Sequence, residues 1–76
     1  MTDKEKKIKE WKDYNIFLAQ IRDNLINGNE TVLEIIKGTD HGVKKVLVDL
    51  HIMDYINSTQ YDDLRQLALE QGVLNG

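Results

Sequence analysis

The chain of 76 residues contains no cysteine and no proline, and its five glycines are spread singly along it. Without cysteine it can form neither a disulfide nor a cysteine-ligated zinc site, the two staples that stabilise many small domains. A single core of this size supplies only about 3 to 5 kcal/mol. We therefore expect oligomerisation or a bound protein to add stability.

Long apolar runs are also absent. No stretch approaches the roughly 18 residues that a membrane span needs, and the N-terminus, MTDKEKKIKEWKD, alternates charges where a signal peptide needs an apolar segment. We expect a soluble, cytoplasmic protein with no membrane partner. Lysine outnumbers arginine eight to two, and isoleucine and asparagine are frequent, a bias typical of AT-rich genomes such as those of many bacteria and phages.

An excess of basic charge is missing as well. The net charge is −3, and residues 1–37 hold seven basic and seven acidic side chains, whereas residues 38–76 hold three basic and six acidic ones. Proteins that bind nucleic acid normally carry a basic excess, which releases counterions from phosphates. The charge balance therefore disfavours nucleic acid as a partner.

Sequence signatures of catalysis are not found. The chain has no glycine-rich phosphate loop, no G-x-S-x-G, no H-E-x-x-H and no cysteine nucleophile. We therefore expect no enzymatic activity and no cofactor. Asp49, His51 and Asp54 are the nearest approach to a metal cluster, but a solvated polar edge is the better interpretation of their spacing, and we expect no metal site.

The first element that the sequence predicts is a long helix over residues 3–27, capped by Thr2 or Asp3 and stopped by Asn27-Gly28. Apolar residues recur along it at spacings of 3, 4, 3 and 4, with Phe17 beside them. This stripe consists of Trp11, Tyr14, Leu18, Ile21 and Leu25. Such a pattern fits a helix that docks on its own core, and it also fits self-association through a short coiled-coil seam.

The middle of the chain allows two interpretations. Residues 29–38, NETVLEIIKG, predict two turns of helix with a possible Asn29 cap, and residues 39–52, TDHGVKKVLVDLHI, carry apolar residues at helical spacing. Apolar and polar residues also alternate in these segments, as they do in a strand, so that segments 30–37 and 43–52 could pair as a hairpin. A two-stranded hairpin is marginally stable unless other elements cover it, and this favours the helices.

Residues 57–74, NSTQYDDLRQLALEQGVL, predict a last helix, capped by Ser58 or Thr59 and closed by Gly72. The predicted architecture is therefore all-α, a single small four-helix domain over residues 1–76 with a long N-terminal helix. The alternative fold is α-β-β-α with the central hairpin.

These observations favour a non-enzymatic regulatory or inhibitory protein that acts by binding another protein, possibly as a homodimer. Buried aromatic side chains dominate the energetics of interfaces. As a helix, the segment 39–52 also has a second apolar face, which another surface must cover. The candidate interface residues are Trp11, Tyr14, Phe17, Val48, Ile52 and Tyr55.

The alternative function is that of a small helix-turn-helix regulator that binds DNA with residues 31–50. When residues 31–50 are aligned with that motif, its buried positions fall on apolar residues of this chain. In the motif, the start of the second helix contacts bases and phosphates. The candidate DNA contacts are Thr39, His41, Lys44 and Lys45. Two positions fit poorly, because Leu33 stands where a small residue is usual and Lys37 where the turn usually has glycine.

Overall fold

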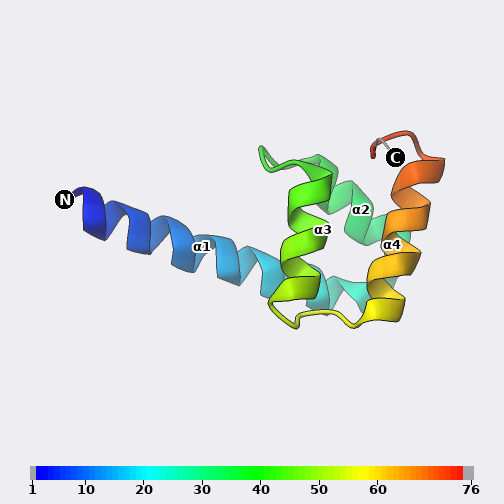
Figure 1. Cartoon of the computed structure of the whole chain (residues 1–76), viewed down its shortest axis with the longest axis horizontal. Coiled ribbons are helices and arrows are strands. Elements are labelled where there is room, and N and C mark those ends of the chain that lie inside the picture. Colours follow the sequence, from blue (N-terminus) through cyan, green and yellow to red (C-terminus); the bar gives the residue numbers. More distant parts are fainter. Residues whose placement is uncertain (1, 75–76) are drawn as a thin grey trace.

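A computed structural model describes residues 2–74 of the chain, and Figure 1 shows the arrangement of its helices. The elements are α1 (Asp3–Asp23), the short 3₁₀ helix η1 (Asn24–Asn27), α2 (Asn29–Lys37), α3 (Val43–Ile52) and α4 (Ser58–Glu70). No strand occurs within residues 2–74. The prediction of an all-α fold with four helices is confirmed, and the alternative hairpin at 30–37 and 43–52 is wrong.

The packing of α3 explains why this segment is a helix. Val46, Leu47 and Leu50 are all buried, which is possible because residues one, three and four positions apart share a face of a helix. In a strand Val46 and Leu47 would point to opposite sides. Ile52, which a strand would place on the same side as Leu50, is instead 71% exposed.

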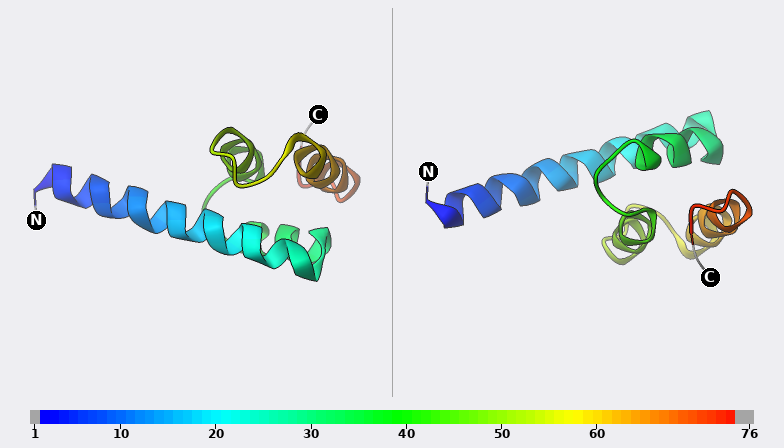
Figure 2. Two further views of the ribbon diagram at one scale, coloured as in Figure 1. Left: turned by 90° about the horizontal axis from the view of Figure 1, so that it is seen from below. Right: turned by 90° about the horizontal axis from the view of Figure 1, so that it is seen from above.

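The helices form two layers. α1, η1 and α2 make one layer, and α3 and α4 lie side by side on one face of it (Figure 2). The core fills the space between the layers and receives residues from every α-helix and from the connection before α4. It consists of Leu18, Ile21, Val32, Leu33, Ile36, Val46, Leu47, Leu50, Ile56, Leu64 and Ala68.

The first helix ends earlier than its sequence predicts. The sequence predicts a helix over residues 3–27, but the α-helix ends at Asp23 and the chain tightens into the 3₁₀ helix η1. Gly28 follows with φ 102°, a conformation that glycine adopts at little cost. Gly28, and not the predicted Asn29, is also the N-cap of α2, so the chain reverses direction within a few residues.

The N-caps of α1 and α4 are formed by side chains, whereas Gly42 precedes α3 without a side-chain cap. Thr2 caps α1 as predicted, since its hydroxyl accepts a hydrogen bond from the amide of Glu5 at 3.2 Å. The cap of α4 is Asn57, and the prediction of Ser58 or Thr59 is wrong by one or two residues. Asn57 and Gln60 bond reciprocally to each other's backbone amides at 2.8 and 2.9 Å, a capping box that satisfies two otherwise free donors.

The N-terminal half of α1 projects beyond the other helices (Figure 1). Every residue from Thr2 to Asp13 is exposed, and Leu18 is the first buried residue of the chain that the structure describes. The molecule measures 42 Å along its longest axis and 23 and 19 Å along the others. Among the helices of residues 2–74, none has the length and apolarity to cross a bilayer.

Candidate functional site

One apolar stripe runs along α1, but only its C-terminal part is covered. Leu18 and Ile21 are fully buried, whereas Trp11 is 61% exposed and Ile8 is 45% exposed. Trp11 lies two helical turns before Leu18 and therefore faces nearly the same side of the helix. The stripe thus continues past the body of the molecule, and no other described part of the chain covers it there.

Two lysines flank the uncovered part of the stripe. Lys4, Lys7, Ile8 and Trp11, together with Asp3, line a shallow hollow of about 430 Å³. The methylene stems of lysine cover apolar surface while the ammonium groups stay in water. We call Lys4, Lys7, Ile8 and Trp11 the α1 face. It combines an aromatic centre with a positively charged border.

A polar link joins α1 to α3 where the projecting part of α1 begins. The Tyr14 hydroxyl donates a hydrogen bond to Asp49 Oδ2 at 2.5 Å. Lys45 Nζ donates to the same oxygen at 2.9 Å and lies 4.2 Å from the centroid of the Tyr14 ring. Such a cation over an aromatic ring is attracted by the ring quadrupole. These three side chains thus connect α1 to α3 at the edge of the body.

The pKa values of the three groups shift in directions that preserve this link. The hydrogen bond from Tyr14, assisted by that from Lys45, lowers the pKa of Asp49. The Asp49 carboxylate is also the largest cause that raises the pKa of Lys45, and burial followed by the Asp49 hydrogen bond raises the pKa of Tyr14. Near neutral pH the aspartate is therefore charged, the lysine protonated and the phenol neutral.

Aromatic side chains extend this cluster toward the connection between α2 and α3. The His41 ring meets the Tyr14 ring edge-on with centroids 4.8 Å apart, and Phe17 lies 5.9 Å from His41. With Glu10, Asp13 and Asp40 these rings line an open cleft of about 580 Å³.

The cluster mixes residues from the two predicted sites. It brings together Tyr14 and Phe17, predicted for a protein interface, with His41 and Lys45, predicted for DNA contact. Tyr14 and Phe17 are half-buried, so their rings are partly engaged within the chain. Of the other two predicted DNA contacts, Thr39 lines the same cleft and donates its hydroxyl hydrogen to the Ile36 carbonyl at 2.7 Å, whereas Lys44 is exposed at the start of α3.

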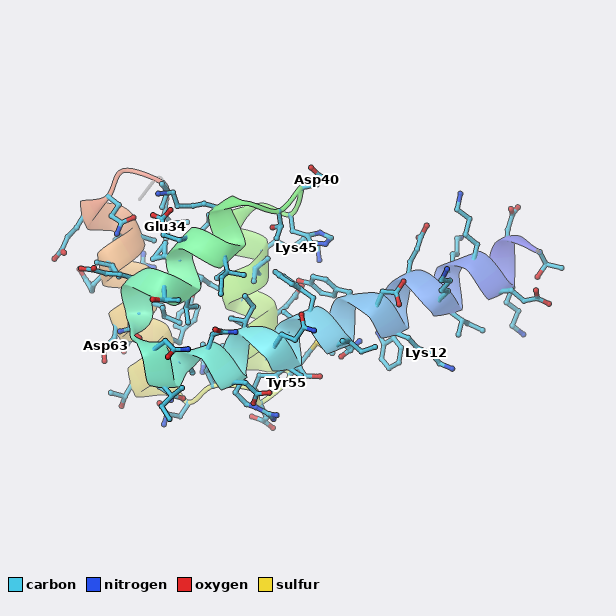
Figure 3. All side chains as sticks on the ribbon, turned by 180° about the vertical axis from the view of Figure 1, so that it is seen from behind. Lys12, Glu34, Asp40, Lys45, Tyr55 and Asp63 are labelled. Carbon is cyan, nitrogen blue, oxygen red and sulfur yellow. The ribbon has the colours of Figure 1, made fainter. Side chains whose placement is uncertain are left out.

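The remaining predicted interface residues do not form one open surface. Val48 and Tyr55 are half-buried, whereas Ile52 is exposed. The Tyr55 hydroxyl donates to Asn15 Oδ1 at 3.2 Å, and the Arg22 guanidinium lies 5.6 Å from the Tyr55 ring centroid. Figure 3 shows Tyr55 beside α1, so this residue joins α1 to the end of α3.

The polar residues considered for a metal site have other neighbours. Asp49 belongs to the Tyr14 link, and His51 Nε2 lies 3.2 Å from Ser58 Oγ while its ring stacks on Tyr61 at 4.7 Å. Asp54 adopts a left-handed conformation, with φ 61°, where α3 ends. Within residues 2–74 no group of three potential metal ligands comes together.

Sequence reasoning missed two features of the site. Ile8 stands three residues before Trp11, so extending the apolar stripe by one step could have identified it. The bond between Tyr14 and Asp49 joins residues 35 positions apart, and no local pattern indicates it.

Comparison with protein-family models, with curated proteins and with solved structures gave no match for this chain.

Proposed function

We propose that this chain is a non-enzymatic regulatory or inhibitory protein that acts by binding another protein through the α1 face. The observation that carries the proposal is the exposure of Trp11 and Ile8 on the stripe that buries Leu18 and Ile21. A tryptophan side chain has only two rotatable bonds and so loses little entropy when a partner covers it, and tryptophan is enriched among the residues that dominate interface energetics.

The magnitude of this effect is adequate for a binding anchor. A tryptophan presents about 150 to 250 Å² of surface, and burial contributes roughly 25 cal/mol per Å². Covering the exposed part of Trp11 therefore contributes about 3 kcal/mol before the costs of association, the range of a hot-spot residue. Because Lys4 and Lys7 border Trp11, the best-fitting partner surface is apolar at its centre and acidic at its edge.

The electrostatics of the Tyr14 link support the non-enzymatic part of the proposal. Catalytic acids, bases and nucleophiles need pKa values moved toward the operating pH. The pKa values of Asp49, Lys45 and Tyr14 all move away from neutrality, which holds each group in its ordinary state. These directions suit a structural link that orients α1 and do not suit proton transfer.

The test compares tagged wild-type protein with two variants, Trp11→Asp and Ile16→Asp, in extracts of the cell that produces the chain. Ile16 is the matched control because it is 58% exposed on the same helix but lies about 140° around the axis from Trp11. The proteins retained by each bait are quantified by mass spectrometry, and circular dichroism verifies that all three baits are folded.

We expect wild type and Ile16→Asp to retain the same partner, and Trp11→Asp to lose at least nine tenths of it, since removing about 2 kcal/mol weakens binding roughly 30-fold. Retention of identical proteins by all three baits would contradict the proposal.

The second candidate function is DNA binding by residues 31–50. One observation favours it: α2 and α3 are joined by a connection over 38–42, and Lys44 is exposed at the start of α3. The contacts of His41 with Tyr14 and of Lys45 with Asp49 favour protein binding instead, because they engage two of the four candidate DNA contacts within the chain.

A further inference from the structure

An acidic groove lies between η1 with the start of α2 on one side and α4 on the other. Its volume is about 540 Å³, and it is lined by Asn27, Gly28, Asn29, Glu30, Thr31, Asp63, Gln66, Leu67 and Glu70. Three of these residues are acidic and none is basic. Leu67 supplies apolar surface within the groove, and Ile26, which directly precedes Asn27, is 90% exposed. The groove therefore combines apolar contact with a carboxylate border.

The acidic groove and the α1 face lie at opposite ends of the molecule. Figure 3 shows Lys12 on the projecting part of α1 and Asp63 at the far end of the body. The charge distribution has the same polarity: residues 3–13 carry five basic and four acidic side chains, whereas residues 14–74 carry five basic and nine acidic ones. One end thus presents lysines beside tryptophan and isoleucine, and the other presents carboxylates around leucine.

We infer that the α1 face of one copy docks into the acidic groove of a second copy, head to tail. This inference rests on the proposed function, because it uses the same face and names a second copy of this chain as a partner. Lys4 and Lys7 of one copy approach Asp63 and Glu70 of the next, and Trp11 covers Leu67. Complementary charges of this kind fix the orientation of an encounter and reject mismatched surfaces.

Head-to-tail contact has a consequence that a symmetric dimer lacks. A pair joined through two different surfaces still has one free surface of each kind, so further copies can add. The result is an open chain of copies, or a ring if the two ends meet. A two-fold pairing of α1 faces would instead stop at two copies and would bring two lysine-bordered surfaces together. Like charges facing each other disfavour that arrangement.

The interface is small, so the association is weak. Surfaces of one helix face and one shallow groove fall below the standard size for stable complexes, and we expect a Kd of roughly 10 to 100 µM. Exposed ion pairs are screened by salt, so raising ionic strength from about 0.05 to about 0.5 M should weaken the association severalfold.

The test is sedimentation velocity on wild type and on two charge-reversal variants. The first variant, Lys4→Glu with Lys7→Glu, loses the α1 face but keeps the groove. The second, Asp63→Lys with Glu70→Lys, loses the groove but keeps the face. All four positions are exposed, so both variants are expected to fold, which circular dichroism verifies.

A matched control isolates the face from the helix. Lys6→Glu with Lys9→Glu makes the same charge change on α1, also at exposed positions, but on the sides turned away from Trp11. We expect this control to associate at least half as strongly as wild type. It separates a specific contact of Lys4 and Lys7 from a general effect of net charge.

We expect the average mass of wild type to rise with concentration beyond that of two copies, and each charge-reversal variant alone to stay monomeric. An equimolar mixture of the two variants should associate again. The intact face of the second variant meets the intact groove of the first, and the reversed face, now acidic, meets the reversed groove, now basic. A monomeric mixture, a wild type that remains monomeric at about 1 mM, or a wild type that stops at two copies would overturn the inference.

Failure of this inference is distinguishable from failure of the proposed function. The wild type could stay monomeric while Trp11→Asp still loses a partner from cell extract. That result would refute the head-to-tail contact and leave the α1 face as the binding site for a different protein. If Trp11→Asp loses nothing from the extract, the proposed function itself fails.

Discussion

Replacing Tyr14 with phenylalanine should weaken the link between α1 and α3 without disturbing the aromatic packing. The change removes only the hydroxyl that donates to Asp49 Oδ2, and the ring keeps its contacts with His41 and Lys45. A hydrogen bond to a charged acceptor contributes about 1.5 to 3 kcal/mol. Asp49 keeps its bond to Lys45 and its side chain is 28% exposed, so water replaces part of what is lost.

We therefore expect Tyr14→Phe to lower the free energy of unfolding by about 1 to 2 kcal/mol. For a chain of this size that change lowers Tm by roughly 4 to 16 °C. A double-mutant cycle with Asp49→Ala separates this bond from the other interactions of each residue, and the coupling energy between the two positions should also be about 1 to 2 kcal/mol at pH 7. Urea denaturation followed by circular dichroism at 222 nm measures all four proteins.

The pH dependence of the coupling gives a stricter test. Because the folded state lowers the pKa of Asp49 below its ordinary 3.8, the contribution of Asp49 is complete above that value and is lost as pH falls through the lowered pKa. Because the pKa of Tyr14 is raised above 10.0, the contribution of the phenol is complete below pH 10.0 and is lost as pH rises through the raised pKa. A coupling energy under about 0.3 kcal/mol at pH 7, or a contribution of Asp49 that is lost already above pH 3.8, would refute this reasoning.

Three further predictions follow from exposure, backbone conformation and charge. Trp11→Ala should change the free energy of unfolding by less than about 0.5 kcal/mol, whereas Leu18→Ala, two turns along the same stripe, should lower it by about 2 to 5 kcal/mol. Urea denaturation measures both variants, and equal losses of stability would place Trp11 in the core. Asp54→Gly should stabilise the fold by about 0.5 to 1 kcal/mol because φ is 61° there, and Asp54→Val should destabilise it by about 1 to 2 kcal/mol. A higher Tm for the valine variant than for the glycine variant would contradict the left-handed conformation of Asp54. The wild type at tens of micromolar should not bind a random DNA duplex, as measured by fluorescence anisotropy at about 50 and about 200 mM salt. Binding that weakens with salt and is abolished by Lys44→Glu with Lys45→Glu would favour the DNA-binding alternative.

The helix over residues 3–23 shows what periodicity can predict. The spacing of Leu18 and Ile21 predicts burial, and both side chains are buried. The same pattern extends to Trp11, where the side chain is mostly exposed. Periodicity identifies the face of a helix but not how far the rest of the chain reaches along it, because that distance depends on the tertiary arrangement of the other helices.

Residues 43–52 show where short apolar runs are ambiguous. Val46, Val48, Leu50 and Ile52 alternate as a strand does, and Val46, Leu47 and Leu50 also fit a helix. The choice depends on which set the rest of the fold can bury, and α2 and α4 provide a core for the helical set. The link from Tyr14 to Asp49 depends on the same tertiary packing, so it could not be predicted before the fold.

The N-cap of α4 has a sequence signal, although the sequence prediction places the cap at Ser58 or Thr59 and the structure places it at Asn57. Asn57 and Gln60 stand three residues apart in N-S-T-Q, which is the spacing of a capping box. Ser58 and Thr59 are themselves good caps, and local preference cannot separate three neighbouring candidates. The reciprocal bond from Gln60 selects Asn57.

The most direct test of the central claim uses Trp11, the only tryptophan of the chain. Protein labelled with 5-fluorotryptophan gives a single fluorine resonance, recorded in buffer and in extract of the cell that produces the chain. The control variant, Trp11→Phe with Ile16→Trp, moves the probe to the other side of the same exposed helix. We predict that the Trp11 resonance shifts or broadens in extract while the control resonance does not. Identical behaviour of the two probes would contradict a binding function for the α1 face.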